Sequence, residues 1–257
     1  MTEQLFPAGA AMVMGGSGAL GAGCARELAR AGSDIALCYR SRKQAADELA
    51  DELRHLTGRV TTHQIDAADA EAVTAAIDVI VAAHGRVHTL VWAAGPLVEQ
   101  HYLSQTSLAQ WKTAVDVEVH GFFATAKALI PHFRDAGGGS FVHLGSVGDL
   151  LWPARDGLSV APKAANEALI RGFAREEGRF NIRANSILVG VIDAGMFREL
   201  QSNGQLDEQW ISQTRKLLAL KRWGSSEDIG HAAVFLASSR AAYITGQQIA
   251  VAGGFGI

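Results

Sequence analysis

Five glycines between residues 15 and 23 are the part of this chain whose spacing most clearly suits a chemical task. They lie in MVMGGSGALGAG, residues 12–23, after an apolar run, Ala10–Met14, and before a helical pattern, Ala22–Ala31. Glycine lets the backbone turn tightly and approach a pyrophosphate closely, and the free N–H groups at a helix start face the phosphate charge. This pattern predicts a dinucleotide-binding turn with contacts from Gly15, Ser17, Gly18, Leu20 and Gly21.

Two arginines indicate which dinucleotide is bound. Arg40-Ser41-Arg42 follows the apolar run Ile35–Tyr39, where NAD sites of this architecture usually carry an acidic residue that binds the ribose hydroxyls. An acidic group would repel a 2′-phosphate, whereas arginine pairs with it. We therefore expect Arg40, with Ser41 or Arg42, to select NADP (NADPH). Asp66 is expected either to meet the adenine or to be solvated.

The elements that position these residues alternate regularly along the chain. Such alternation is typical of βαβ units, which build a doubly wound parallel α/β sheet with helices on both faces. Asp69 and Ser226, with Ser225 competing, are the expected helix N-caps. Strands are predicted at Ala10–Met14, Ile35–Tyr39, Val60–Ile65, Thr89–Ala94, Ser140–Leu144, Arg183–Leu188 and Gln248–Val251, and further helices at Gln44–His55, Ala70–His84, Leu108–Phe133, Ala164–Gly178 and Ser226–Ala237.

We expect one Rossmann domain over residues 1–257. The segment 190–222 interrupts the alternation of strands and helices, and it carries scattered large apolar residues among polar ones. It is interpreted as a lid over a substrate pocket, or alternatively as a plain helical insertion.

Composition excludes several classes of function. The net charge is −3, so nothing recruits nucleic acid or an acidic membrane surface, and no apolar stretch is long enough to span a bilayer. Two cysteines, Cys24 and Cys38, form no disulfide framework or zinc pattern, and His84 and His88 are read as non-ligands, so no metal is expected. The start of the chain lacks the features of a signal peptide, and a cytoplasmic location is expected.

From Gly15 to Gly254 the chain resembles the short-chain dehydrogenase/reductase family. GGSGALG resembles the family's glycine motif, and WAAG at residues 92–95 stands where the family has NNAG. Gly145-Ser146 resembles the strand end that carries the catalytic serine, and Lys163 stands 17 residues later, at the family's lysine. The segments 181–190 and 243–254 resemble the family's later signatures.

This resemblance implies a seven-stranded fold and a set of site residues. Ser146 is the expected catalytic serine, and Lys163 is expected to bind the nicotinamide ribose. Ala94, Gly95 and Val191 are expected to line the cofactor site. The family also commonly forms homodimers or homotetramers, which makes residues 108–133 and 164–178 the first candidates for a subunit interface.

The sequence departs from the family at the active site. Ser159 stands at the position of the catalytic tyrosine, and Glu118 at that of the active-site asparagine. A tyrosine starts near pKa 10, and a serine hydroxyl is far less acidic, so Ser159 suits hydrogen bonding to an oxyanion better than general-base chemistry. Reduction is therefore expected over alcohol oxidation.

The proton donor and the substrate stay open. Glu118, Asp149, Asp156 or water are candidate replacements for the missing acid, and Trp92, Trp152 and His101 are candidate pocket walls. The substrate is expected to be a small molecule: a carbonyl compound, an enoyl thioester or an imine. Two rival readings are a catalytically silent NADP-binding sensor or partner subunit, and a non-redox enzyme on the same fold.

Overall fold

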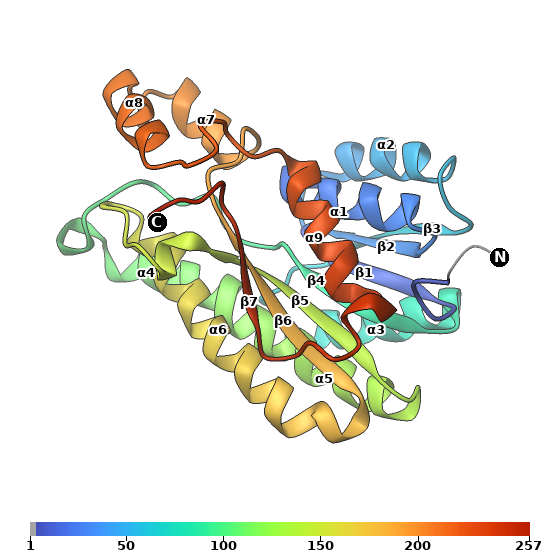
Figure 1. The fold of residues 1–257 in the computed structure, drawn as a ribbon. Helices are drawn as coiled ribbons and strands as arrows, with labels where there is room; N and C mark the ends of the chain where they lie inside the picture. Colours follow the sequence, from blue (N-terminus) through green and yellow to red (C-terminus); the bar gives the residue numbers. More distant parts are fainter. Residues whose placement is uncertain (1–3) are drawn as a thin grey trace.

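A single seven-stranded parallel sheet forms the centre of the protein (Figure 1). The structure, a computed structural model, describes residues 4–257. The strand order is β3-β2-β1-β4-β5-β6-β7, so the order reverses between β1 and β4, where open sheets of this type bind ligands. The strands are β1 (Ala10–Met14), β2 (Asp34–Tyr39), β3 (Val60–Gln64), β4 (Val87–Trp92), β5 (Gly139–Ser146), β6 (Ile182–Val189) and β7 (Gln248–Val251).

Helices cover both faces of the sheet, which confirms the predicted doubly wound α/β fold. One face carries α1 (Ala19–Arg30), α2 (Lys43–Leu53) and α9 (Ser226–Ala237), whose buried residues share one core cluster. The other face carries α3 (Ala70–His84), α5 (Gly121–Asp135) and α6 (Gly157–Glu177). Two short helices, α7 (Met196–Ser202) and α8 (Glu208–Lys216), lie between β6 and α9. Figure 1 shows them beyond the end of the sheet.

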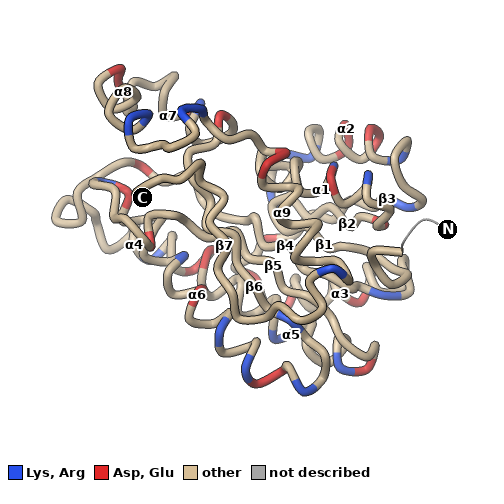
Figure 2. The backbone as a smooth tube through the Cα atoms, in the orientation of Figure 1, with Lys and Arg blue, Asp and Glu red and all other residues tan. Residues whose placement is uncertain are grey.

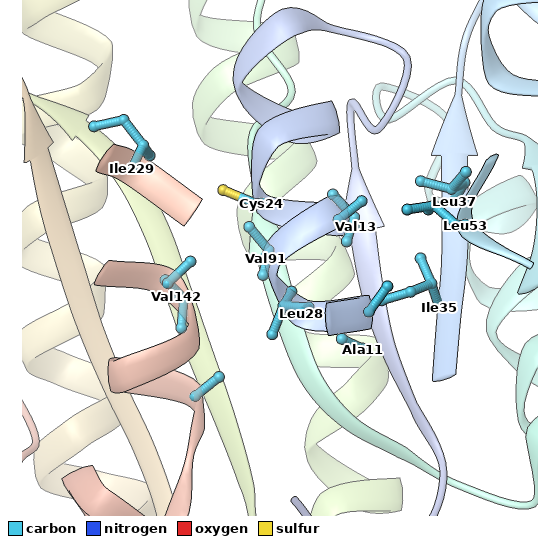
Figure 3. Close-up of a cluster of buried hydrophobic side chains, with 14 of the residues drawn as sticks. Ala11, Val13, Cys24, Leu28, Ile35, Leu37, Leu53, Val91, Val142 and Ile229 are labelled. Carbon is cyan, nitrogen blue, oxygen red and sulfur yellow. The ribbon is translucent and has the colours of Figure 1, made fainter. Parts of the chain in front are cut away.

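Two apolar cores, one on each face, hold the layers together. Figure 3 shows the first, where Val13 of β1 and Ile35 of β2 lie beside Leu28 of α1. Cys24 and Cys38 are buried and unpaired in α1 and β2, as small apolar residues would be. Because the central strands are buried on both faces, their sequences are nearly continuous apolar runs.

Two helices differ most from the sequence prediction, and α1 begins at Ala19 rather than Ala22. The segment predicted as one helix over 108–133 is α4 (Leu108–Val115), a π-helical turn at Asp116–His120, and then α5. The helix predicted from Ala164 begins earlier, at Gly157, and contains Pro162. Asp69 caps α3 as predicted, whereas Ser225 rather than Ser226 caps α9.

Charged residues are interspersed over helices and loops rather than gathered on one face in the view of Figure 2. In α2, for example, Lys43 pairs with Asp47 at 2.5 Å. Among residues 4–257, no helix combines the length and hydropathy that a membrane span requires.

Candidate functional site

The glycine turn between β1 and α1 is tightly packed against itself. Gly15 has a φ of +78°, a left-handed conformation that favours glycine. A Cβ at Gly21 would lie 2.3 Å from the Gly15 carbonyl oxygen, so a larger residue does not fit there. The first turn of α1 therefore lies directly over the end of β1.

The start of α1 provides hydrogen-bond donors that the chain leaves unused. Gly18 is the N-cap residue, it makes no side-chain capping bond, and the first turn of the helix holds no acidic residue. An anion at this end is favoured by the free N–H groups and by the helix dipole. The turn and helix therefore fit the pyrophosphate of a dinucleotide, with Ser17 and Leu20 in the same segment.

The Arg42 side chain lies beside the glycine turn. One of its guanidinium nitrogens would be 3.6 Å from a Cβ placed at Gly18. Arg40, which the sequence made the leading candidate, is exposed, and its carbonyl oxygen accepts a hydrogen bond from Gln64 Nε2 at 2.9 Å. Asp66 is exposed and accepts a hydrogen bond from the Ala68 backbone N–H at 3.0 Å.

The end of β4 joins the glycine turn to the remaining candidate residues. A Cβ on Gly15 would lie 2.6 Å from the Ala93 carbonyl oxygen and 2.8 Å from Ala94 N. A Cβ on Gly95 would lie 2.8 Å from Glu118 Oε2 and 3.7 Å from Lys163 Nζ. Ala94 and Gly95 therefore connect the cofactor turn to the Glu118 and Lys163 side chains.

Glu118 and Lys163 form an ion pair inside this site. Lys163 Nζ donates to Glu118 Oε2 at 2.7 Å, and the Glu118 side chain is only 3% exposed. Burial raises the pKa of the Glu118 carboxyl, but Lys163 and His143 lower it by more, so the pKa lies below its ordinary value. Glu118 is thus a carboxylate. It lies in the π-helical turn, an irregularity that often occurs at functional sites.

The two candidate serines lie at the end of β5 and in the first turn of α6. Ser146 ends β5, and its Oγ accepts a hydrogen bond from the Gly148 backbone N–H at 3.1 Å. Ser159 lies one turn before Lys163 on α6, so the two side chains share a face of the helix. A hydroxyl that accepts one bond still has a proton to donate, so both serines can donate to an acceptor atom.

The other candidate acids lie in different surroundings. Asp156 Oδ1 accepts a hydrogen bond from Gln100 Nε2 at 3.0 Å, and burial raises the pKa of its carboxyl. Asp149 is exposed and lies 3.4 Å from Gln248 Nε2, beside β7. Asp156 is therefore better suited than Asp149 to donate a proton.

The expectation that Trp92 lines the pocket is wrong. Its side chain is fully buried in the core and packs against Phe122 with ring centroids 5.6 Å apart. Trp152 is half-exposed in the loop before α6, and His101 forms an isolated bridge with Asp156.

Sequence reasoning missed three buried polar residues, of which two, His143 and Asn166, lie next to Glu118. His143 of β5 lies with Nε2 3.7 Å from Glu118 Oε1 and Nδ1 3.0 Å from Glu167 Oε1. Asn166 Nδ2 donates to the Glu118 carbonyl oxygen at 2.9 Å. The available signal was a histidine inside an apolar strand, FVHLGS, together with Asn166 and Glu167 one turn after Lys163.

The segment after β6 holds Val191 and the two short helices. Val191 is half-buried, and its carbonyl oxygen accepts a hydrogen bond from the Gly224 N–H at 3.0 Å. Phe197 of α7 packs on Trp223 with ring centroids 5.4 Å apart. The two ends of the insertion are therefore joined to each other, and its apolar residues form a small core of their own.

Known proteins resemble this chain over nearly its whole length. The family described as enoyl-(acyl carrier protein) reductase matches residues 15–256. A 3-oxoacyl-[acyl-carrier-protein] reductase from Chlamydia muridarum is 30% identical over 246 residues, covering 95% of this chain and 96% of its own. An NADP-dependent mannitol dehydrogenase from Hypocrea jecorina is 29% identical over 249 residues, covering 95% of this chain and 91% of its own.

Solved structures agree with these relatives. A short-chain type dehydrogenase/reductase from Mycobacterium ulcerans superposes with a TM-score of 0.90 at 28% identity, covering 97% of this chain and 90% of its own. Carveol dehydrogenase from Mycobacterium avium, in complex with NAD, gives a TM-score of 0.90 at 28% identity, with 96% of each chain covered. The chain therefore belongs to the short-chain dehydrogenase/reductase family and is an oxidoreductase of that type.

Proposed function

We propose that this protein is an NADPH-dependent reductase of a small carbonyl, enoyl-thioester or imine substrate. The observation that carries the proposal is the buried Lys163–Glu118 pair, which is 2.7 Å long and lies against Gly95 beside the glycine turn. A paired lysine next to a dinucleotide turn suits the binding of a nicotinamide ribose. The name of one relative and the description of the matching family support a carbonyl or an enoyl substrate attached to an acyl carrier protein.

Within the proposal, a bound nicotinamide supplies hydride to the substrate. Ser146 and Ser159 donate hydrogen bonds to the acceptor atom of the substrate and stabilise the negative charge that develops on it. Lys163 holds the ribose and carries the proton nearest to the substrate. Glu118, as a carboxylate, pairs with Lys163 at 2.7 Å and fixes its position.

The hydroxyl of Ser159 favours reduction of the substrate over oxidation. A serine hydroxyl does not readily lose a proton near neutral pH, so it cannot accept the proton of an alcohol as a base. It can still donate a hydrogen bond to an oxygen that gains charge. Asp156, whose pKa burial raises, is the second proton donor we consider.

A titration and a turnover panel test this function. NADPH and NADH fluorescence titrations measure binding, and NADPH oxidation is then followed with ketones, enoyl thioesters and cyclic imines. We expect turnover with one class and a loss of roughly 100-fold in Glu118→Gln and Ser159→Ala, since acid–base and oxyanion groups contribute on this scale. Thr74→Ala, which removes an exposed hydroxyl on α3, is the matched control. Turnover that survives both site variants would refute the assigned roles.

A second candidate is a catalytically silent NADP-binding protein. It is favoured by one observation: Glu118 neutralises Lys163 within the site, so the cation is not free to act on a substrate. This reading predicts tight NADPH binding with no oxidation of NADPH by any member of the panel.

We also propose that the protein is a homodimer or homotetramer assembled through α5 and α6. Phe123 of α5 is 45% exposed and stacks on Phe173 of α6, with ring centroids 6.4 Å apart. Sedimentation velocity of the wild type and Phe123→Lys tests it, and a wild-type monomer would refute it.

A further inference from the structure

A row of polar side chains crosses the sheet beneath α6. His143 of β5 pairs in register with Trp92 of β4 and Ser186 of β6, and Ser186 pairs with Gln248 of β7. Side chains at paired positions of neighbouring strands point to the same face of a sheet. Other side chains that β5 and β6 point to this face, Phe141, Ile182 and Ala184, are apolar, so the row is a polar strip within the core on that face.

Glu167 of α6 lies over this row and is fully bonded. His143 Nδ1 is 3.0 Å from Glu167 Oε1, Ser186 Oγ donates to the same oxygen, and Gln248 Nε2 donates to Oε2 at 2.9 Å. The side chains of His143 and Glu167 are at most 1% exposed. Buried carboxylates are retained only where such partners compensate for lost water.

The opposite edge of the imidazole faces the candidate active site. His143 Nε2 is 3.3 Å from Asn166 Nδ2 and 3.7 Å from Glu118 Oε1. Within residues 4–257, Glu118 Oε1 is buried and has no hydrogen-bond partner, whereas Oε2 is bonded to Lys163. Glu118 Oε2 therefore accepts a hydrogen bond from Lys163, and Oε1 can accept one from His143.

The charges of this cluster balance only if His143 is protonated. Glu118 and Glu167 contribute two negative charges, and Lys163 contributes one positive charge. A neutral His143 would leave one uncompensated negative charge in the interior, and an imidazolium would cancel it. Burial lowers the pKa of His143, and the two carboxylates raise it by more, so the pKa lies above its ordinary value. The neighbouring rings, Phe122 and Trp92, are uncharged.

We propose that His143 is a buried proton-holding residue that acts through Glu118 and Lys163 and replenishes the proton used in reduction. This inference rests on the proposed function. After hydride transfer, a Lys163 N–H bond breaks and a new bond to hydrogen forms on the substrate. The His143 Nε2–H bond breaks as its proton passes to Glu118 Oε1, and the imidazole becomes neutral. The carboxyl group then rotates so that this O–H faces Lys163, the O–H bond breaks, and Lys163 regains its proton. No oxidant or reductant enters this part of the sequence. Between turnovers a proton from solvent enters at Lys163, whose side chain is 20% exposed, and returns to His143 by the same path.

Histidine ring nitrogen NMR tests the charge state without any substrate. With ¹⁵N-labelled histidine in the full chain, we expect His143 to be an imidazolium at neutral pH in the wild type. Glu118→Gln and Glu167→Gln should each shift its titration to lower pH. His88 is the internal control, because burial lowers its pKa to about 3 and it lies away from this cluster. A neutral His143 throughout pH 6–8, unaffected by Glu118→Gln, would overturn the proposal.

Kinetics test the role in turnover. His143→Gln keeps a hydrogen-bond donor but holds no exchangeable charge. We expect kcat to fall roughly 10–100-fold above neutral pH, with a smaller deficit in acid and an unchanged KM for NADPH. His88→Gln, a matched change of a buried histidine, should leave the pH profile unaltered. A uniform loss at every pH would indicate a purely structural role and would refute the proposal.

The two readouts separate this inference from the proposed function. If no substrate is turned over, the NMR titration still reports whether His143 carries a charge that depends on Glu118. If His143→Gln does not fold, Glu167→Gln removes only the distant carboxylate and should move the same titration. A protein that reduces a substrate with a wild-type pH profile in Glu167→Gln contradicts the inference and leaves the proposed function standing.

Discussion

Replacing Lys163 with methionine should destabilise the protein more than the loss of an exposed ion pair does. The change leaves the Glu118 carboxylate charged and unpaired in the interior. The pair is 2.7 Å long, with side chains 20% and 3% exposed for Lys163 and Glu118. At an effective dielectric constant of about 20, two unit charges at this distance attract by about 6 kcal/mol. Desolvation offsets part of this attraction, and removing one partner of a buried pair costs about 3–5 kcal/mol. The partial exposure of Lys163 places the expected loss near 3 kcal/mol, the low end of that range.

Urea unfolding of four proteins measures this loss: the wild type, Lys163→Met, Glu118→Gln and the double variant. The double variant should be more stable than the sum of the single losses predicts, because it buries no unpaired charge. Arg54→Met removes the partner of the exposed Asp51 and should cost less than about 1 kcal/mol.

Acid should narrow the difference between the wild type and Lys163→Met. The pKa of Glu118 is lowered in the folded protein, so its contribution to stability is present above the ordinary carboxyl pKa and is lost as the pH falls through the folded value. The reasoning is refuted if Lys163→Met costs under about 1 kcal/mol at neutral pH and the single losses simply add.

Three further predictions concern the cofactor turn and the core. Arg42→Ala should weaken NADPH binding by about 10–100-fold, the worth of a charge-assisted hydrogen bond, with no comparable loss for NADH; Arg54→Ala is the control in the same fluorescence titration. Gly21→Ala should abolish NADPH binding, because its Cβ would meet the Gly15 carbonyl oxygen at 2.3 Å. Gly172→Ala, where a Cβ meets nothing within 4 Å, should bind normally and gain about 0.5–1 kcal/mol in urea unfolding. Cys24 and Cys38 should resist iodoacetamide in the folded protein and react once it is unfolded. Both thiols are buried, and burial raises the pKa of the Cys24 thiol to about 12. Mass spectrometry detects the modification, and alkylation of the native protein would contradict the prediction.

Regular alternation of strands and helices made most of the fold predictable from the sequence. Strands Ala10–Met14 and Gln248–Val251 and helices Ala70–His84 and Ser226–Ala237 have the predicted bounds, because short apolar runs and helix caps are local signals. The glycine turn was equally predictable, because the space at Gly15 and Gly21 permits few other residues.

Features that depend on packing between distant segments were not predictable. The π-helical turn at Asp116–His120 interrupts an apolar period that reads as one continuous helix. Arg40 and Arg42 are indistinguishable by type, and only the course of the chain after β2 brings Arg42 toward Gly18. His143 is 24 residues from Glu167, and their contact follows from strand register and from the seating of α6.

Transfer of deuterium from NADPH labelled at the reactive ring position tests the central claim most directly. The wild-type protein is incubated with the labelled cofactor and each substrate class, and the product is analysed by mass spectrometry. Our account predicts that deuterium appears on the reduced carbon of one class of substrate, and that Glu118→Gln greatly slows its appearance. Tight NADPH binding with no label in any product would contradict the claim that the Lys163–Glu118 site performs reduction.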